Sequence, residues 1–141
     1  MLERSVPLPL CGLWHLALRV RDLAKSRVFY QDLLGMKVVW EPDPENLYLS
    51  LGQDNLALHQ IPKEATLAPG PLQALDHLGF IVPSQDAVDS IASAMEQAGV
   101  VIVTPIRLHR DGSYSFYMED PDHNRVQILY EPRMVVSQIP R

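Results

Sequence analysis

The sequence predicts an α+β protein made of two modules of the same order, βαβββ, whose strands form a curved mixed sheet around a cavity. Two short apolar runs, 13–20 and 75–82, each contain one histidine and open the two halves of the chain. Each run is followed by a helical pattern that ends at a glycine, Gly35 or Gly99, and then by three strand-like runs. The two histidines are 62 residues apart and the two glycines 64, which indicates a duplicated unit.

The composition fits one domain. With 141 residues, of which 47% are hydrophobic, the chain can bury a core but is short for two independent domains. We expect a single domain over 11–132, with modules at about 11–61 and 74–132. The stretch between them, 62–73, holds three prolines and a glycine and is predicted to be a linker. The residues outside the domain are terminal extensions, 1–10 and 133–141.

The charge and the cysteine content exclude several classes of protein. The formal net charge is −5 and no basic run is present, which argues against nucleic-acid binding because phosphate contacts need clustered lysines and arginines. The longest apolar stretches are strand-sized and the first residues lack a secretory pattern, so we expect neither a membrane span nor export. A single cysteine, Cys11, has no partner for an internal disulfide, which favours the reducing cytoplasm.

Each element of the first module has a local cause in the sequence. Asp22 is a good N-cap, and apolar residues recur at helical spacing as far as Gly35, which predicts a helix at about 22–34. Short apolar runs bounded by Pro, Asp, Asn and Gly then predict three strands. These strands are expected at 36–40, 47–51 and 56–59.

The second module repeats this order. Ser84 caps a helix whose apolar residues form one face and which ends at Gly99. Three strands are expected after it, at 100–106, 113–119 and 125–131. The last two are joined by Asp-Pro-Asp-His-Asn at 120–124, a predicted turn in which proline fixes one dihedral and the Asp and Asn side chains bond local amides.

Four polar side chains fall at paired positions of the two modules: His15, His59, His77 and Gln127. Side chains of a strand alternate between its faces, so the bulky apolar residues share one face and these four residues share the other. A curved sheet would direct the four at one metal or ligand cavity. Three imidazoles and an amide oxygen suit a borderline divalent ion such as zinc, iron(II), nickel or manganese.

Other interpretations of the same residues stay open. His15 and His77 are also compatible with buried neutral imidazoles bonded to the backbone, and His59 with a strand-end histidine near solvent. Gln127 would equally suit a polar residue of the cavity wall that binds substrate directly. The two remaining histidines are expected on the solvated surface: His109 in a loop and His123 in the turn.

The two βαβββ units, a histidine in the first strand of each, and the segment Phe-Tyr-Met-Glu-Asp-Pro-Asp-His-Asn-Arg-Val-Gln-Ile at 116–128 resemble the vicinal oxygen chelate superfamily. This superfamily includes glyoxalase I, methylmalonyl-CoA epimerase, extradiol dioxygenases, fosfomycin-resistance enzymes and bleomycin-binding proteins. The similarity covers about residues 11–132. It implies a homodimer that acts on a small molecule, and a divalent metal ion held by residues of the first and last strands of each module. Those positions are His15, His59, His77 and Gln127.

Gln127 departs from the family pattern, because most catalytic relatives have glutamate at this position. The amide oxygen of glutamine can coordinate a cation, but the amide cannot act as a general base near neutral pH. The resemblance therefore leaves His59, or a carboxylate of the cavity, as the candidate group for proton transfer.

Two classes of function follow from the resemblance. The first is a glyoxalase-like metalloenzyme, a lyase or isomerase whose ion binds adjacent oxygens of the substrate and stabilises an enolate or similar oxyanion. An iron-dependent dioxygenase is a variant within this class. The second is a metal-free binding protein of the bleomycin-resistance type, which would hold a small molecule in a cleft at a dimer interface. The loss of the glutamate motivates this second hypothesis.

Overall fold

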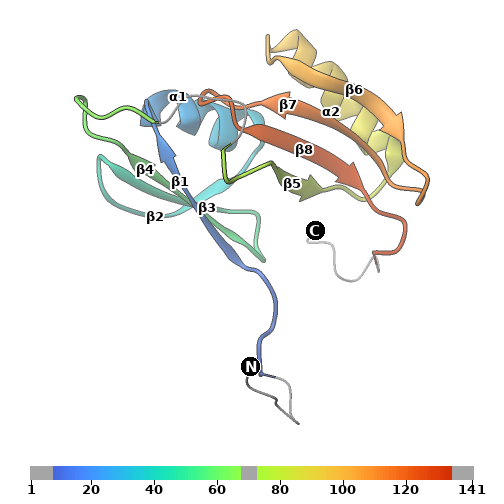
Figure 1. Cartoon of the computed structure of the whole chain (residues 1–141), viewed down its shortest axis with the longest axis horizontal. Coiled ribbons are helices and arrows are strands. Elements are labelled where there is room, and N and C mark those ends of the chain that lie inside the picture. The colour runs from blue at the N-terminus through green and yellow to red at the C-terminus, as the bar shows by residue number, and fades with distance from the viewer. Residues whose placement is uncertain (1–7, 68–72, 135–141) are drawn as a thin grey trace.

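The computed structural model describes residues 8–67 and 73–134, so that 68–72 of the predicted linker and parts of both terminal extensions lie outside the described residues (Figure 1). The predicted α+β fold of two βαβββ modules is confirmed. The first module contains β1 (His15–Val20), α1 (Leu23–Arg27), the π-helix η1 (Val28–Leu33), β2 (Lys37–Asp43), β3 (Asn46–Ser50) and β4 (Asn55–Gln60). The second contains β5 (Leu78–Ile81), α2 (Gln85–Gln97), β6 (Ile102–Leu108), β7 (Tyr114–Glu119) and β8 (Arg125–Tyr130).

The strands of each module form a mixed four-stranded sheet, and the two sheets have the same topology. The first has the order β1-β4-β3-β2 and the second β5-β8-β7-β6. In each, the first strand of the module pairs in parallel with the last strand, and the other pairs are antiparallel. As a result β1 and β5 are edge strands within the described residues, and one side of each is left without a sheet neighbour.

The first predicted helix is two helices of different kinds. Asp22 caps α1 as expected, and its side chain accepts a hydrogen bond from the backbone N–H of Lys25. After α1 the chain widens into the π-helix η1, where the N–H of Leu34 bonds to the carbonyl of Phe29, five residues earlier. Hydrophobic spacing predicts a helix in both cases, because the two forms differ by one residue in their hydrogen-bond register. Gly35 ends this segment with a positive φ of 78°.

The second helix follows the sequence prediction more closely. The side chain of Ser84 accepts a hydrogen bond from the N–H of Ala87, and Gly99 follows the helix with a φ of 79°. Helix α2 packs against β6, β7 and β8 through one apolar face (Figure 1). Val88, Ala92 and Met95 of this face are buried.

Strands β2 and β6 extend beyond their predicted ends and contain Pro42 and Pro105. Proline lacks the N–H that a central strand must donate, so it is tolerated mainly at sheet edges. Both strands are edge strands of their sheets, which explains why the prolines do not interrupt them.

Each sheet has a face that packs into the core and an opposite face, called here its open face. In β1, Leu18 and Val20 are buried, whereas His15, Ala17 and Arg19 on the alternate positions are exposed. The predicted alternation of this strand is therefore confirmed. The core is formed mainly by aliphatic residues of both modules, among them Leu47, Leu49, Leu56, Leu58, Met118, Val126 and Ile128.

The two halves of the chain are joined through α1 and the predicted turn between β7 and β8. The hydroxyl of Ser26 donates to Asp122 Oδ2 at 3.3 Å, and the backbone N–H of Arg21 donates to Asp122 Oδ1 at 2.9 Å. The hydroxyl of Tyr30 donates to Asp120 Oδ2 at 2.6 Å. Figure 1 shows α1 at this junction, between the two sheets. The segment from Arg21 to Tyr30, which includes α1, and the turn thus link the modules, without pairing of β1 and β5 among the described residues.

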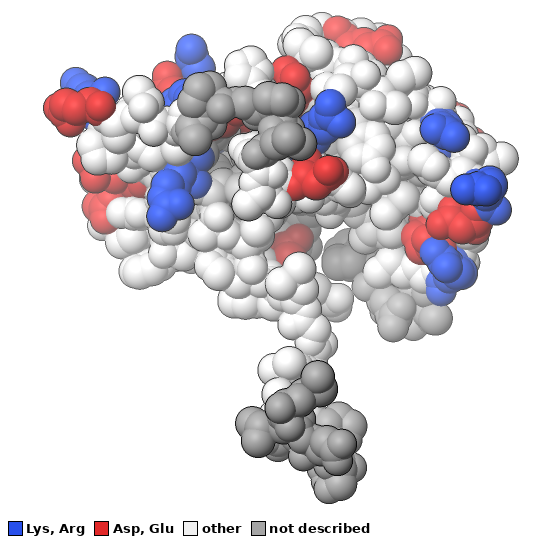
Figure 2. Space-filling model, viewed as in Figure 1, with Lys and Arg blue, Asp and Glu red and all other residues white. Residues whose placement is uncertain are grey.

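Charged side chains of both signs are distributed over the surface (Figure 2). On the face shown in Figure 2, basic and acidic side chains are interspersed, without a basic patch. Among residues 8–67 and 73–134, none of the helices is long and apolar enough to cross a membrane.

Candidate metal centre

His15 is the first residue of β1 and lies on the open face of the first sheet. Its Nδ1 is 2.6 Å from Oδ1 of Asn55, the residue opposite it in β4. An amide oxygen only accepts hydrogen bonds, so His15 Nδ1 carries the proton and the lone pair of Nε2 is available. A hydrogen-bond acceptor behind the ring nitrogen is the usual support of a metal-ligating histidine.

His77 also has an oxygen acceptor at Nδ1, but this acceptor is the preceding residue of the chain rather than a residue of the neighbouring strand. His77 immediately precedes β5, and its Nδ1 is 2.6 Å from Oδ1 of Asp76. This hydrogen bond, opposed by a smaller desolvation effect, lowers the pKa of the Asp76 carboxyl from its usual value. The imidazole also meets the ring of Tyr117 edge-on, with the centroids 5.2 Å apart. Asp76 and Tyr117 therefore fix the orientation of the His77 ring. The bond to Asp76 uses Nδ1 and leaves Nε2 free.

His59 shares the open face of the first sheet but lies away from His15. Its backbone is opposite Arg19, four residues along β1 from His15, which is about 13 Å at roughly 3.3 Å per residue. The ring of Tyr48 contacts both imidazoles, with centroids 6.5 Å from His15 and 5.8 Å from His59. His59 Nδ1 is 2.6 Å from Asn46 Oδ1, which again leaves Nε2 free.

The strand register defines which positions of the two modules correspond. Gln127 lies opposite Gly79 in β5 and Tyr117 in β7. In the first sheet the residue opposite Ala17 in β1 and Tyr48 in β3 is Ala57. Ala17 follows His15 by two residues, as Gly79 follows His77. The counterpart of Gln127 is therefore Ala57, and the pairing of Gln127 with His59 expected from the sequence does not match the register.

The amide of Gln127 is held by residues that the sequence analysis did not select. Gln127 Nε2 donates to the hydroxyl of Ser115 at 3.0 Å, and Ser115 Oγ is 3.1 Å from His109 Nε2. His109 lies in the loop after β6, as expected, but it is half-buried and takes part in this network, which the sequence analysis did not predict. The signal for Ser115 was its alternation with Tyr117 along β7, which gives both residues the same face as Gln127.

The donor groups occur on both sheets but do not form a compact cluster within the described residues. There, no group of three or more His, Cys, Asp or Glu side chains lies close enough to hold one ion. The contacts above keep His15 and His59 with the first sheet, and His77 and Gln127 with the second. The types of donor nevertheless fit a divalent ion, because His15 and His77 supply imidazole nitrogens and Gln127 an amide oxygen.

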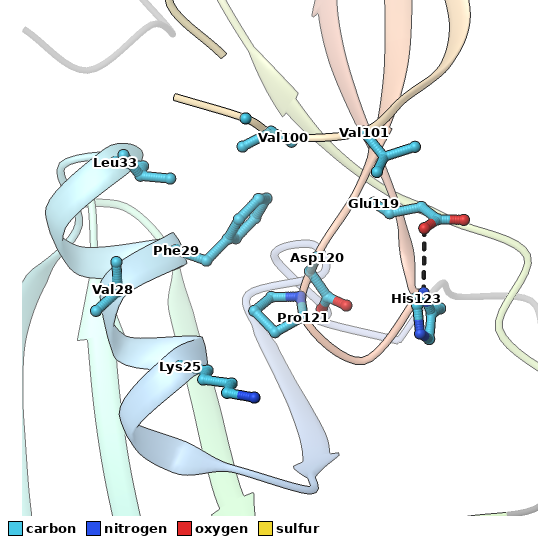
Figure 3. Close-up of a pocket in the computed structure, with 11 residues that line it drawn as sticks. Lys25, Val28, Phe29, Leu33, Val100, Val101, Glu119, Asp120, Pro121 and His123 are labelled. Atoms are coloured by element: carbon cyan, nitrogen blue, oxygen red, sulfur yellow. Dashed lines mark hydrogen bonds and ion pairs between the residues drawn. The ribbon is translucent and has the colours of Figure 1, made fainter. Parts of the chain in front are cut away.

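Two hollows of the described surface lie elsewhere. The first, of about 420 Å³, lies between α1, η1 and the β7–β8 turn (Figure 3). Phe29 and Pro121 form part of its wall, and His123 bonds to Glu119 at its rim. The second, of about 280 Å³, is lined mainly by apolar residues of η1, β5 and α2. Neither is lined by any of the four predicted site residues.

Comparison with known proteins agrees with the repeated fold. A family model described as the Glyoxalase/Bleomycin resistance protein/Dioxygenase superfamily matches residues 12–128. The chain belongs to this superfamily, as its resemblance to the vicinal oxygen chelate proteins predicted.

Relatives of known sequence carry different activities. The chain is 31% identical over 129 residues to a 2,2',3-trihydroxybiphenyl dioxygenase of Sphingomonas paucimobilis, a match that covers 88% of this chain and 42% of the dioxygenase. The chain thus spans about two fifths of that enzyme. It is 29% identical over 120 residues to the glutathione transferase FosA of Serratia marcescens, covering 81% of this chain and 77% of FosA.

Solved structures support the fold. A lactoylglutathione lyase from Agrobacterium tumefaciens superimposes with a TM-score of 0.71 at 22% identity, covering 87% of this chain and 96% of the lyase. A glyoxalase/bleomycin resistance protein/dioxygenase from Alicyclobacillus acidocaldarius gives a TM-score of 0.63 at 22% identity, covering 86% of this chain and 92% of the other.

Proposed function

We propose that this protein is a glyoxalase-like, metal-dependent enzyme that acts on a small molecule bearing adjacent oxygens. The proposal rests on one observation, the hydrogen bonding of the imidazoles of His15 and His77. Each directs Nδ1 to an oxygen acceptor at 2.6 Å and leaves Nε2 free, at corresponding positions of two related modules. Both side chains are exposed, whereas histidines that serve packing alone would be buried.

In this proposal His15, His77 and Gln127 hold the ion. When bound, a divalent cation would supply Lewis acidity toward adjacent oxygens of a substrate. Three protein ligands leave coordination positions for those oxygens. Two imidazoles and an amide bring no negative charge, so the site favours substrates that carry their own anionic oxygen. Zinc, iron(II), nickel and manganese remain the candidate ions.

His59 takes a separate part in the proposal. It is two residues beyond the position that corresponds to Gln127, and its Nε2 is free. We assign it proton transfer, which the Gln127 amide cannot perform, and no coordination of the ion. A substrate that extends over Tyr48 from the His15 side would reach this imidazole.

The same proposal includes a homodimer. Since His15 is on edge strand β1 and His77 precedes edge strand β5, a second copy that approaches these edges would bring the two half-sites together. The first half-site of one copy would then face the second half-site of the other. The single cysteine, Cys11, is a free thiol, and we place the protein in the reducing cytoplasm.

Metal analysis tests this function directly. The metal content of protein purified without an affinity tag is measured by elemental mass spectrometry. The protein is then titrated with zinc, nickel, manganese and iron(II). We expect one ion per chain, and turnover of an α-hydroxy ketone, hemithioacetal or catechol that is lost on chelation and regained with the ion. Absence of binding by all four ions would refute the proposal.

A second candidate function has its own support in the first sheet. Trp40 is 56% exposed, and the centroid of its ring lies 4.9 Å from that of the Tyr48 ring on the open face. Exposed aromatic rings of this kind stack on planar ligands without a metal. A metal-free binding protein of the bleomycin-resistance type would show thermal stabilisation by an aromatic ligand in excess chelator, and Trp40→Ala would abolish it.

The iron-dependent dioxygenase remains a variant of the first proposal. It is favoured by the 31% identity to the trihydroxybiphenyl dioxygenase. Oxygen uptake with catechols in the presence of iron(II) but not zinc would select this variant.

A further inference from the structure

Gln127 lies on β8 with its amide in a defined orientation. Its Nε2 donates to Ser115 Oγ at 3.0 Å. Its Oε1 is directed to the β5 side, because a Cβ added to Gly79 would lie 3.3 Å from that oxygen. Strand β5 begins immediately after His77. The oxygen of Gln127 therefore faces the strand whose preceding residue is the second imidazole of the candidate centre.

The serine that holds the amide is itself constrained. Ser115 is only 1% exposed, so water does not compete for its hydroxyl. A hydroxyl has one proton, and the bond from Gln127 uses a lone pair of Oγ. The proton of Ser115 is thus left for another acceptor, and His109 Nε2 lies 3.1 Å away. The resulting chain of donation runs from Gln127 through Ser115 to His109.

This direction of donation determines which end of the amide faces β5. If Ser115 donated to Gln127 instead, the amide would have to turn its oxygen toward the serine and its NH₂ group toward β5. An NH₂ group cannot ligate a cation. With His109 Nε2 as the acceptor, the serine proton points away from Gln127, and Oε1 stays on the β5 side.

We propose that Ser115 and His109 are positioning residues that hold the Gln127 amide with its oxygen toward the metal centre. This inference rests on the proposed function, because it assigns Gln127 as a ligand. It also accounts for the amide at position 127. A glutamate has no N–H to donate to Ser115, so the present direction of donation is matched to glutamine.

The test uses cobalt(II) as the probe ion, with affinity measured by competition against a chromogenic chelator and coordination followed in the visible spectrum. Supporting residues of metal ligands typically contribute about 10- to 100-fold in affinity. We expect losses of this size, with a changed spectrum, for Ser115→Ala and His109→Leu. Ser115→Thr keeps the hydroxyl, and His109→Gln places an acceptor near the position of Nε2. Both should retain the wild-type affinity and spectrum.

A second readout does not depend on the ion. In ¹H–¹⁵N spectra the side-chain NH₂ pair of Gln127, assigned through its absence in Gln127→Glu, should be ordered in the wild type and averaged in Ser115→Ala. His123→Ala, in the exposed turn, is the matched control and should change neither readout. Wild-type cobalt affinity and spectrum in Ser115→Ala would overturn the inference while leaving the proposed function intact. If the wild-type protein binds no cobalt, zinc, nickel, manganese or iron(II), the proposed function fails and the ligand role of Gln127 fails with it.

Discussion

Tyr30 and Asp120, which are 90 residues apart in the sequence, share a hydrogen bond of 2.6 Å between the phenolic hydroxyl and Oδ2. Tyr30 is fully buried in η1, and Asp120 is 4% exposed at the end of β7. The bond joins the two halves of the chain away from both open faces. Because Asp120 Oδ1 also accepts the N–H groups of Asp122 and Asn124, the carboxylate orders the turn and fixes it to the helix.

Removal of this hydroxyl should destabilise the fold. Tyr30→Phe leaves one bond of a buried carboxylate unmade, and we expect a loss of about 1–3 kcal/mol in the free energy of unfolding, measured by urea denaturation. Tyr114→Phe is the matched control, because its hydroxyl bonds to Asp89 at an exposed site and its loss should have little effect. Equal stabilities of the two variants would contradict the role of Tyr30.

The same residue predicts an alkaline limit of stability. Burial, followed by the charge of Asp120, raises the pKa of Tyr30 well above its usual value of 10.0. The folded state then holds this proton more tightly than the unfolded state. The stabilisation is complete below pH 10.0 and decreases as the pH rises above it. In denaturation series across this range, Tyr30→Phe should lose stability less steeply than the wild type. If the free energy of unfolding of Tyr30→Phe fell with pH as steeply as that of the wild type, a group other than Tyr30 would be responsible for the alkaline loss.

Single substitutions of the histidines should distinguish those that ligate the metal from those that only lie near it. We expect His15→Ala and His77→Ala to abolish measurable metal binding in calorimetric titration, because each removes an imidazole nitrogen from a site with three protein donors. His59→Ala should leave the affinity unchanged and lower turnover. The exposed His123 again supplies the control. Loss of metal affinity in His59→Ala equal to that in His15→Ala would return His59 to the ligand set.

The oxygen acceptors that bond to Nδ1 of His15 and His77 should strengthen metal binding. Asn55→Ala and Asp76→Ala remove the oxygens that hold Nδ1 of His15 and His77, and we expect about 10- to 100-fold weaker binding of zinc. Asn55→Asp and Asp76→Asn retain an oxygen acceptor and should bind nearly as the wild type does. If the alanine variants matched the wild type in competition assays, the acceptors would have no role in orienting the rings.

Mixing of two inactive variants tests the site shared between copies. His15→Ala and His77→Ala chains each lack one donor, but a heterodimer with shared sites contains one intact site and one site that lacks both imidazoles. Random exchange of chains should therefore restore about one quarter of the wild-type metal sites. A site formed within one chain would give none, and this result, with a monomeric mass by light scattering, would refute the shared arrangement.

Local sequence patterns predicted the modules of this protein and their faces. Asp22 and Ser84 begin the helices, and Gly35 and Gly99 follow them, since capping depends on a few neighbouring residues. Alternation along a strand has a fixed period of two, so the sequence placed Gln127 on the face opposite the buried Val126 and Ile128. The superfamily could be recognised from the same local signals.

The correspondence between the modules required the tertiary structure. His15 and Ala57 are separated by 42 positions, whereas His77 and Gln127 are separated by 50, because the connecting segments differ in length. Matching the last strands by their order alone therefore paired Gln127 with His59, whereas the strand register pairs it with Ala57. Only the pairing of β1 with β4, and of β5 with β8, defines the match.

Contacts between distant segments also required the structure. The bonds of Ser115 to Gln127 and His109, and of Tyr30 to Asp120, join residues on different elements, and no periodicity within one element encodes them. The sequence by itself thus determined the order of the helices and strands, the buried faces and the kinds of donor available. The fold decided which donors correspond and which neighbours orient them, because strand register and helix packing depend on energies of the whole chain rather than of one segment.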